Sequence, residues 1–500
     1  MLFRNTLAQT TGLVIGFAFS FLLAPIMISR LGLDKFGIWA VTGAFAAYAG
    51  LFDLGIGRSL IRFTAIFDAD RRFDRIRQCV GLGLIAVTLV GLLALGAVAL
   101  AAPLLSDKLG VLDTGEMRIV GMASVAMLSL NGYQDVLNSV GLGKRQMVPP
   151  NVAISIGAAI NFTLSVAALI VSDSLVVYAL ANVVAGVLAL VPTYFAMRRV
   201  WARPYLAMPS RELVREMLGF SIKDQIGWLA ELVNFQTDKI VIALAVDIRA
   251  AAIYEIASRV VMGVRAVAIM SVSAMVATAA ARIVEEGREV VGSMFRRYTR
   301  LSCAVSFPLF VVASVTAPFL LVAWLGDAPG DSELLVPFLT LAFMFNVSTG
   351  AGATIATGAG EPGVVAVNNV LIAVLNIAFT VALAPFFGIW GVVIGTFLAL
   401  IAGSLRFTKR FLEMFELPWR DFVGGVLPTA ALSFGLAIPS ALIALYFGAP
   451  DGRPAAIVLL GIGSLLYLIP YWLLASRLEY LPEKLRFPRS RAATPGEGLA

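Results

Sequence analysis

The chain has 500 residues, 59% of them hydrophobic and 14% charged, with a mean hydropathy of +0.90 and a net charge of +7. This composition excludes a water-soluble globular protein and indicates a polytopic membrane protein. Since the chain has no histidine, a histidine general base and a histidine-ligated metal are also excluded.

Apolar segments of about 20 residues, each long enough to cross a hydrocarbon core of roughly 30 Å, recur along the whole chain. The predicted fold class is all-α, and no stretch remains for a soluble domain. We predict fourteen membrane-spanning helices, over residues 8–29, 38–57, 79–101, 118–140, 149–171, 175–196, 217–246, 252–281, 300–324, 333–357, 363–385, 389–408, 423–447 and 455–476.

The basic residues predict the orientation of these spans. With the N-terminus inside, 28 of the 38 lysines and arginines fall on cytoplasmic segments and six on outer loops. Because basic residues near helix ends stay in the cytoplasm, both termini are predicted to be cytoplasmic. The positive charge is then mainly an orientation signal, and we expect no nucleic-acid partner.

Polar side chains interrupt several spans. Span 2 ends in "GLFDLGIGRSLIRF", which carries Asp53, Arg58 and Arg62. At about 100° per residue, one side of span 4 carries Asn131, Gln134, Asp135 and Asn138. One narrow face of span 7 carries Asp224, Glu231, Asn234 and Asp238, and Lys239 follows.

In span 8, Glu255 and Arg259 are four residues apart and are predicted to pair, whereas Arg265 projects elsewhere. A charge near the bilayer centre costs about 2.5 to 3.5 kcal/mol. These side chains are therefore predicted to line an aqueous path. The alternative is that the polar residues only bond neighbouring helices to one another.

The chain also contains a weak internal repeat. Residues 141–151 match 358–368 at an offset of 217, and "NFTLSVAAL" from Asn161 parallels "NIAFTVALA" from Asn376 at an offset of 215. Because spans 4 and 5 thereby map onto spans 10 and 11, we expect two six-helix units followed by an appended helix pair.

Three stretches resemble a known superfamily: "RLGLDKFGIWA" at 30–40, "GLFDLGIGRSLIRF" at 50–63, and "LVNFQTDKIVIALAV" followed by "AAIYEIASRVV" across spans 7 and 8. Together with the span order they resemble the multidrug/oligosaccharidyl-lipid/polysaccharide exporter superfamily, and within it the O-antigen and exopolysaccharide flippases. The resemblance implies two lobes, 1–200 and 201–415, that form a V around a polar cavity. Helices 13 and 14 (416–480) and a cytoplasmic tail (481–500) would follow.

The resemblance implies a function in the bacterial inner membrane. The protein would flip polyprenyl-diphosphate-linked oligosaccharide repeat units to the periplasmic leaflet by alternating access, coupled to protons or sodium ions, for O-antigen (lipopolysaccharide) or exopolysaccharide synthesis. Membrane lipids surround it, and a glycan polymerase and a chain-length regulator are further expected partners. We expect no enzymatic activity and no cofactor, because the glycine-rich "GAGEPG" at 358–363 joins two spans and lacks the strand that precedes a nucleotide-binding loop.

A diphosphate requires cations, and sugars require amide or carboxylate groups. The expected substrate-binding residues are Arg265, Lys239, Arg259, Arg58, Arg62, Asn131, Gln134, Asp135, Asn138 and Asn234. The positive-inside bias alone also explains Arg58 and Arg62. Buried carboxylates are the natural ion carriers, and the expected ion-coupling residues are Glu231, which is mid-span and the first choice, with Asp224, Asp53, Glu255 and Asp238.

Three alternatives stay open. A flippase of the lipid II type would also have fourteen spans, whereas a multidrug or cation antiporter of the same superfamily typically has twelve. A membrane glycosyltransferase is the remotest alternative, because such enzymes usually need a sizeable loop outside the membrane and the longest outer loop here has roughly 15 residues.

Overall fold

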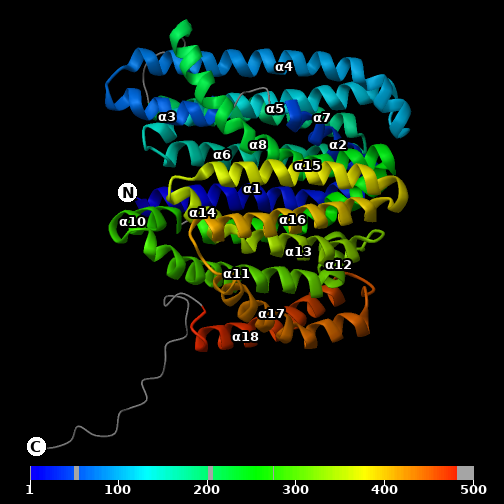
Figure 1. The fold of residues 1–500 in the computed structure, drawn as a ribbon. Coiled ribbons are helices and arrows are strands. Elements are labelled where there is room, and N and C mark those ends of the chain that lie inside the picture. The colour runs from blue at the N-terminus through cyan, green and yellow to red at the C-terminus, as the bar shows by residue number, and fades with distance from the viewer. Residues whose placement is uncertain (1, 50–55, 201–206, 274, 481–500) are drawn as a thin grey trace, which may run out of the picture. The chain divides into compact units, whose positions relative to one another are not determined.

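A computed structural model describes residues 2–49, 56–200, 207–273 and 275–480, which are helical apart from short connections. Figure 1 shows the helices in chain order. They are α1 (Leu2–Leu31), α2 (Leu33–Ala49), α3 (Ile56–Ala69), α4 (Phe73–Leu109), α5 (Thr114–Gly143), α6 (Val148–Val171), α7 (Leu175–Val200), α8 (Arg211–Ala245), α9 (Ile248–Ser273), α10 (Met275–Glu286), a 3-10 turn (Arg288–Val290), α11 (Val291–Val315), α12 (Ala317–Leu325), α13 (Ser332–Ser348), α14 (Gly350–Gly358), α15 (Pro362–Phe387), α16 (Ile389–Met414), α17 (Trp419–Phe447) and α18 (Arg453–Arg477).

Nine helical segments of the described residues are long and apolar enough to cross a membrane. The most apolar is α4, with a mean hydropathy of 2.6 over its most apolar stretch. The helices α5, α8 and α9, which carry most of the polar side chains singled out above, are not among the nine. The prediction of an all-α, polytopic membrane protein is confirmed, and the polar residues are concentrated on the helices that least resemble ordinary membrane spans.

The chain packs into two compact units. Unit 1 comprises Met1–Arg259, Pro329–Ser332 and Ala366–Ala399, and unit 2 comprises Val260–Ala328, Glu333–Val365 and Leu400–Ala500. The helix α9 therefore begins in unit 1 and continues into unit 2. The two polar clusters described below lie entirely in unit 1, whose first segment ends at Arg259.

Unit 1 is built from α1 to α8, the first half of α9, most of α15 and the first part of α16. Within it α4 packs on α5, α6 on α7, and α1 on α6. Small residues allow close approach: a Cβ at Gly143 would lie 2.6 Å from the Thr64 Cβ and 2.8 Å from the Ile61 carbonyl oxygen. In unit 2, α11 packs on α17, and α12 on α18, around a core that includes Phe295 and Phe411.

Two of the connections that fall in the predicted repeat have similar backbone geometry. The turn from α5 to α6 and the turn from α14 to α15 have the same three backbone hydrogen bonds, 2.8 to 3.1 Å long, with the donor three, four or five residues after its acceptor. The left-handed residue is Arg145 (φ 59°) in the first turn and Gly360 (φ 84°) in the second, which are 215 residues apart. The same three bonds also follow α3, α16 and α18, so they are a general way to end a helix, and the offset of 217 stays a prediction.

Candidate functional site

Three charged side chains of α8 and α9 form one cluster around the buried Glu255. Lys239 Nζ lies 2.6 Å from Glu255 Oε2, and Arg259 Nε lies 2.7 Å from Glu255 Oε1. The Glu255 side chain is 8% exposed. The helix spacing of four residues explains the pair within α9, whereas Lys239 reaches Glu255 from α8. We call these three residues the cationic cluster.

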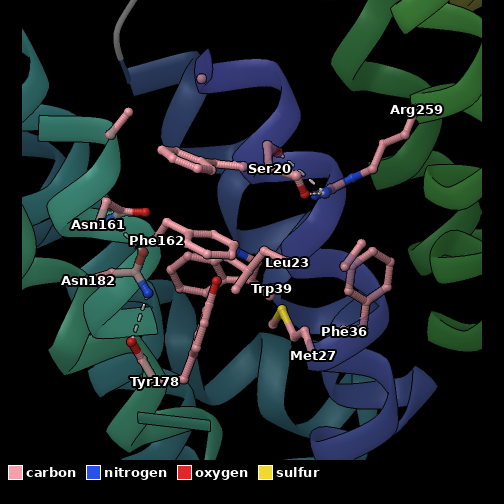
Figure 2. A pocket seen from close by; sticks show the side chains of 14 residues that line it. Ser20, Leu23, Met27, Phe36, Trp39, Asn161, Phe162, Tyr178, Asn182 and Arg259 are labelled. Carbon is pink, nitrogen blue, oxygen red and sulfur yellow. Dashed lines mark hydrogen bonds between the residues drawn. The ribbon is translucent and has the colours of Figure 1, made fainter. Parts of the chain in front are cut away.

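Arg259 extends the cationic cluster to two further helices. Its Nη1 donates to the Ser20 carbonyl on α1 at 3.1 Å, and its guanidinium carbon lies 5.3 Å from the centre of the Phe36 ring on α2. Figure 2 shows this side chain reaching toward Ser20. One carboxylate faces two cations, so the cluster retains one net positive charge in a site of low exposure. Such a site attracts an anion.

Asp238, next to Lys239 in the chain, lies in a separate polar network. Its side chain is 1% exposed, and its Oδ2 accepts hydrogen bonds from Tyr254 Oη at 2.5 Å and from Thr396 Oγ1 at 2.9 Å. Its Oδ1 is buried and accepts no hydrogen bond from the described residues. Asn376 Nδ2 in turn donates to Thr396 Oγ1 at 3.3 Å. We call these four residues the Asp238 network.

Among the described residues, the Asp238 network has fewer hydrogen-bond donors than acceptors. Thr396 Oγ1 lies 2.9 Å from Asp238 Oδ2 but also 3.0 Å from the Val392 carbonyl oxygen. A hydroxyl carries one hydrogen and can serve only one of these acceptors fully. A proton or a small cation among these oxygens would satisfy what the hydroxyl cannot.

The cationic cluster and the Asp238 network are joined through the backbone. Asp238 and Lys239 are consecutive on α8, and Tyr254 and Glu255 are consecutive on α9. Each helix therefore contributes one residue to each site, and a shift of either helix changes both.

A pocket of about 190 Å³ lies beside the cationic cluster, between α1, α2, α6 and α7. Figure 2 shows its lining. Aromatic rings form much of the wall: Trp39 and Tyr178 meet edge to face with centroids 5.1 Å apart, and Phe19 stacks on Phe162 at 4.7 Å. None of the fourteen lining residues is acidic, and Arg259 is the charged member.

Two asparagines supply the amide groups of this pocket. Asn161 Nδ2 donates to Asn182 Oδ1 at 3.0 Å, and Asn182 Nδ2 donates to the Tyr178 carbonyl at 2.9 Å. On α15 and α16, Asn376 and Thr396 lie 215 and 214 residues after Asn161 and Asn182, and the same order of hydrogen bonds occurs there. One helix pair thus directs its polar groups to the pocket, and the other directs them to Asp238.

The polar residues that were predicted on one face of α5 differ in their burial. Gln134 and Asn138 are buried, whereas Asn131 and Asp135 are exposed. Neither polar atom of the Asn138 amide has a hydrogen-bond partner among the described residues.

The other predicted site residues are not members of the cationic cluster. On α8, Glu231 is exposed and Asn234 is partly buried; Arg62 is exposed on α3. Arg265 belongs to unit 2, where its guanidinium carbon lies 5.9 Å from the centre of the Phe343 ring. Asp53 and the side chains of Arg58 and Asp224 lie outside the described residues.

Several residues of these sites were not predicted from the sequence: Ser20, Trp39, Tyr178, Asn182, Tyr254 and Thr396. Asn161 and Asn376 appeared only as members of the repeat. For Asn161 and Asn376 the signal is a polar residue that recurs at one position of both copies within an apolar helix, since such residues seldom lack a partner.

The comparisons with known proteins concern most of the chain. A family model described as polysaccharide biosynthesis protein matches residues 2–281. No curated protein sequence matches.

Several solved structures share the fold. The structure of the lipid II flippase MurJ in an inward closed conformation is 12% identical, with 95% of this chain and 100% of that chain covered at a TM-score of 0.71. An inward-facing multidrug resistance MATE family transporter of the MOP superfamily is 17% identical, with 80% and 94% covered at 0.66. A MOP superfamily transporter from Pyrococcus furiosus is 18% identical, with 80% and 96% covered at 0.51.

Proposed function

Because the chain belongs to the polysaccharide biosynthesis protein family, we propose that it is a transporter that flips polyprenyl-diphosphate-linked oligosaccharides. The oligosaccharide repeat units would be moved from the cytoplasmic to the periplasmic leaflet of the bacterial inner membrane by alternating access, with no enzymatic step. The flipped repeat units would supply O-antigen or exopolysaccharide synthesis. A glycan polymerase and a chain-length regulator are the proposed partners that take up the flipped units.

The cationic cluster beside an acid-free pocket is the observation that carries this proposal. Lys239 and Arg259 retain one positive charge after pairing with Glu255, and this charge suits a diphosphate or another anionic group. The pocket adds amides and aromatic rings suited to sugars. An antiporter for organic cations is disfavoured, because such a ligand would meet Arg259 and no carboxylate in the pocket lining.

Complementation tests the proposal. The chain is expected to restore surface glycan in a strain that lacks its O-antigen or exopolysaccharide flippase. Failure in several such strains, with the protein present in the membrane, would contradict the proposal. A lipid II flippase is the second candidate, and the TM-score of 0.71 to MurJ favours testing it. Growth of a lipid II flippase depletion strain would select that candidate.

We further propose fourteen spans in two six-helix lobes, 1–200 and 201–415, in a V around a cavity, followed by a helix pair at 416–480 and a cytoplasmic tail at 481–500. Reporter fusions near the outer loops, at Asp113, Asp327 and Asp451, are expected to report periplasm. Fusions after Arg72, Arg203, Arg297 and Lys409 are expected to report cytoplasm. A reversal at any site contradicts this topology.

Arg265 is a further proposed cation for the diphosphate. A charge-assisted contact is worth about 1.5 to 3 kcal/mol, so Arg265→Ala is expected to reduce glycan export by roughly one to two powers of ten. Arg265→Lys should retain part of the activity, because the lysine ammonium keeps the positive charge but cannot form the two parallel hydrogen bonds of a guanidinium. Export is measured at equal protein level, with the exposed Arg406→Ala as the matched control. If the Arg265→Ala variant exports glycan at the wild-type rate, Arg265 has no role in binding the diphosphate.

For ion coupling we propose Asp238 in place of the first choice made from the sequence, Glu231. The buried Oδ1 without a hydrogen-bond partner and the hydroxyl shared between two acceptors support a site that takes up a proton or a sodium ion. Glu255, with ion pairs on both oxygens, is better suited to positioning the two cations. Glu231, Asp224 and Asp53 stay weaker ion-coupling candidates, and the remaining proposed substrate contacts are Arg58, Arg62, Asn131, Gln134, Asp135, Asn138 and Asn234.

A further inference from the structure

The pocket beside Arg259 has the composition of a binding site for a small polyhydroxylated ring. Its volume of about 190 Å³ is below the roughly 300 to 1,000 Å³ of pockets for drug-sized ligands. It can therefore hold one sugar ring but not a whole oligosaccharide. We propose that this pocket binds a single sugar ring of the transported headgroup, with Asn161 and Arg259 as its hydrogen-bonding residues and Trp39 as part of its aromatic wall. The inference rests on the proposed function for the identity of the ligand.

Asn161 has hydrogen-bonding capacity left for such a ligand. An amide has two N–H groups and one oxygen acceptor, and the interaction with Asn182 uses one N–H of Asn161. The side-chain oxygen and the second N–H have no hydrogen-bond partner among the described residues. A hydroxyl group both donates and accepts, so a sugar can use both groups at once.

Asn182 fixes the direction of the Asn161 amide. It is 4% exposed, and because its own Nδ2 donates to the Tyr178 carbonyl, its Oδ1 is the atom that faces Asn161. The Asn161 Nδ2 is thereby oriented toward Asn182, and its oxygen is directed the other way. Figure 2 shows that oxygen pointing toward the interior of the pocket.

Arg259 completes the polar side of the pocket. Its Nε is held by Glu255, and its Nη1 by Ser20, while Nη2 donates to no described residue. The guanidinium is therefore fixed in orientation but still has donors for a ring hydroxyl or a ring carboxylate.

The repeat gives an independent argument. In the second copy Asn376 donates to Thr396, and Thr396 lies within hydrogen-bond distance of the Asp238 carboxylate. In the first copy the Asn161 and Asn182 pair faces a pocket whose lining has no carboxylate. The same helix framework thus has its polar groups satisfied internally in one copy and available to a ligand in the other.

The test measures sugar binding without transport. Saturation-transfer NMR on the purified full chain is carried out with glucose, galactose, N-acetylglucosamine and glucuronate, and with tetraphenylphosphonium as a cationic probe. At least one sugar is expected to bind, and Asn161→Ala is expected to weaken it about ten-fold, since it removes one to two hydrogen bonds. Trp39→Phe should weaken the same sugar while retaining an aromatic ring, and it provides the test if Asn161→Ala fails to fold.

Ser155→Ala is the matched control, because Ser155 lies on the same helix and donates to the Asn151 carbonyl, outside the pocket. The inference is overturned if no sugar binds the folded protein, if binding survives both pocket variants, or if these variants abolish binding of the cationic probe instead. Complementation with no sugar binding would overturn this inference alone. If a sugar binds but the chain complements none of the strains, the proposed function alone is overturned.

Discussion

Asp238→Asn is expected to abolish the stimulation of transport by an ion gradient. The amide has nearly the shape of the carboxylate and can still accept from Tyr254, but it neither carries a charge nor takes up a proton at neutral pH. Coupling between two binding events is typically worth about 1 to 3 kcal/mol, so the stimulation should fall by roughly 5 to 150-fold. The measurement is export of lipid-linked oligosaccharide in vesicles, with a proton or a sodium gradient imposed separately.

Glu231→Gln is the matched control, because it makes the same chemical change at an exposed position of the same helix. We expect it to leave the stimulation largely intact. The opposite result, with Glu231→Gln uncoupled and Asp238→Asn coupled, would return the ion-carrying role to Glu231. Which of the two gradients drives the wild-type protein identifies the ion.

Glu255→Gln is expected to cause the largest loss of stability. Removing one partner of a buried ion pair typically costs about 3 to 5 kcal/mol, and here the change leaves Lys239 and Arg259 without their shared carboxylate. Thermal unfolding can be followed with a thiol-reactive fluorophore, because both cysteines, Cys79 and Cys303, are buried in the folded protein.

Two further variants test the reason for this loss. Glu413→Gln also removes a carboxylate from two cations, Lys409 and Arg410, but at a side chain that is 50% exposed, so a loss of no more than about 1 kcal/mol is expected. Adding Lys239→Met to Glu255→Gln should recover part of the stability, since one stranded charge is removed with its partner. An equal loss for Glu255→Gln and Glu413→Gln would show that burial of the cationic cluster has no energetic effect.

The sequence predicted what depends on one helix at a time. Hydropathy identified the all-α membrane fold, the quoted stretches identified the family, and both predictions are confirmed. The pair of Glu255 and Arg259 followed from a spacing of four residues and is present. The participation of Lys239 was not predictable, because it depends on how α8 and α9 face each other.

Burial also limited the prediction on α5. Residues within an arc of about 100° were treated as one polar face, yet Gln134 and Asn138 are buried while Asn131 and Asp135 are exposed. An arc of that width spans both the packed and the unpacked side of a helix. The pocket was missed for a related reason: Trp39 and Tyr178 are typical apolar span residues in sequence, and only the packing of four helices brings them to Asn161.

The consecutive placement of Asp238 with Lys239 and of Tyr254 with Glu255 has a thermodynamic consequence. If an ion bound at Asp238 changes the affinity of the cationic cluster for an anion by some factor, the anion must change the affinity for the ion by the same factor. The two sites then act as one reciprocal pair: a cell that lacks the anionic ligand holds a transporter with altered affinity for its ion. Where this factor exceeds one, the protein binds its ion less tightly without cargo than with it.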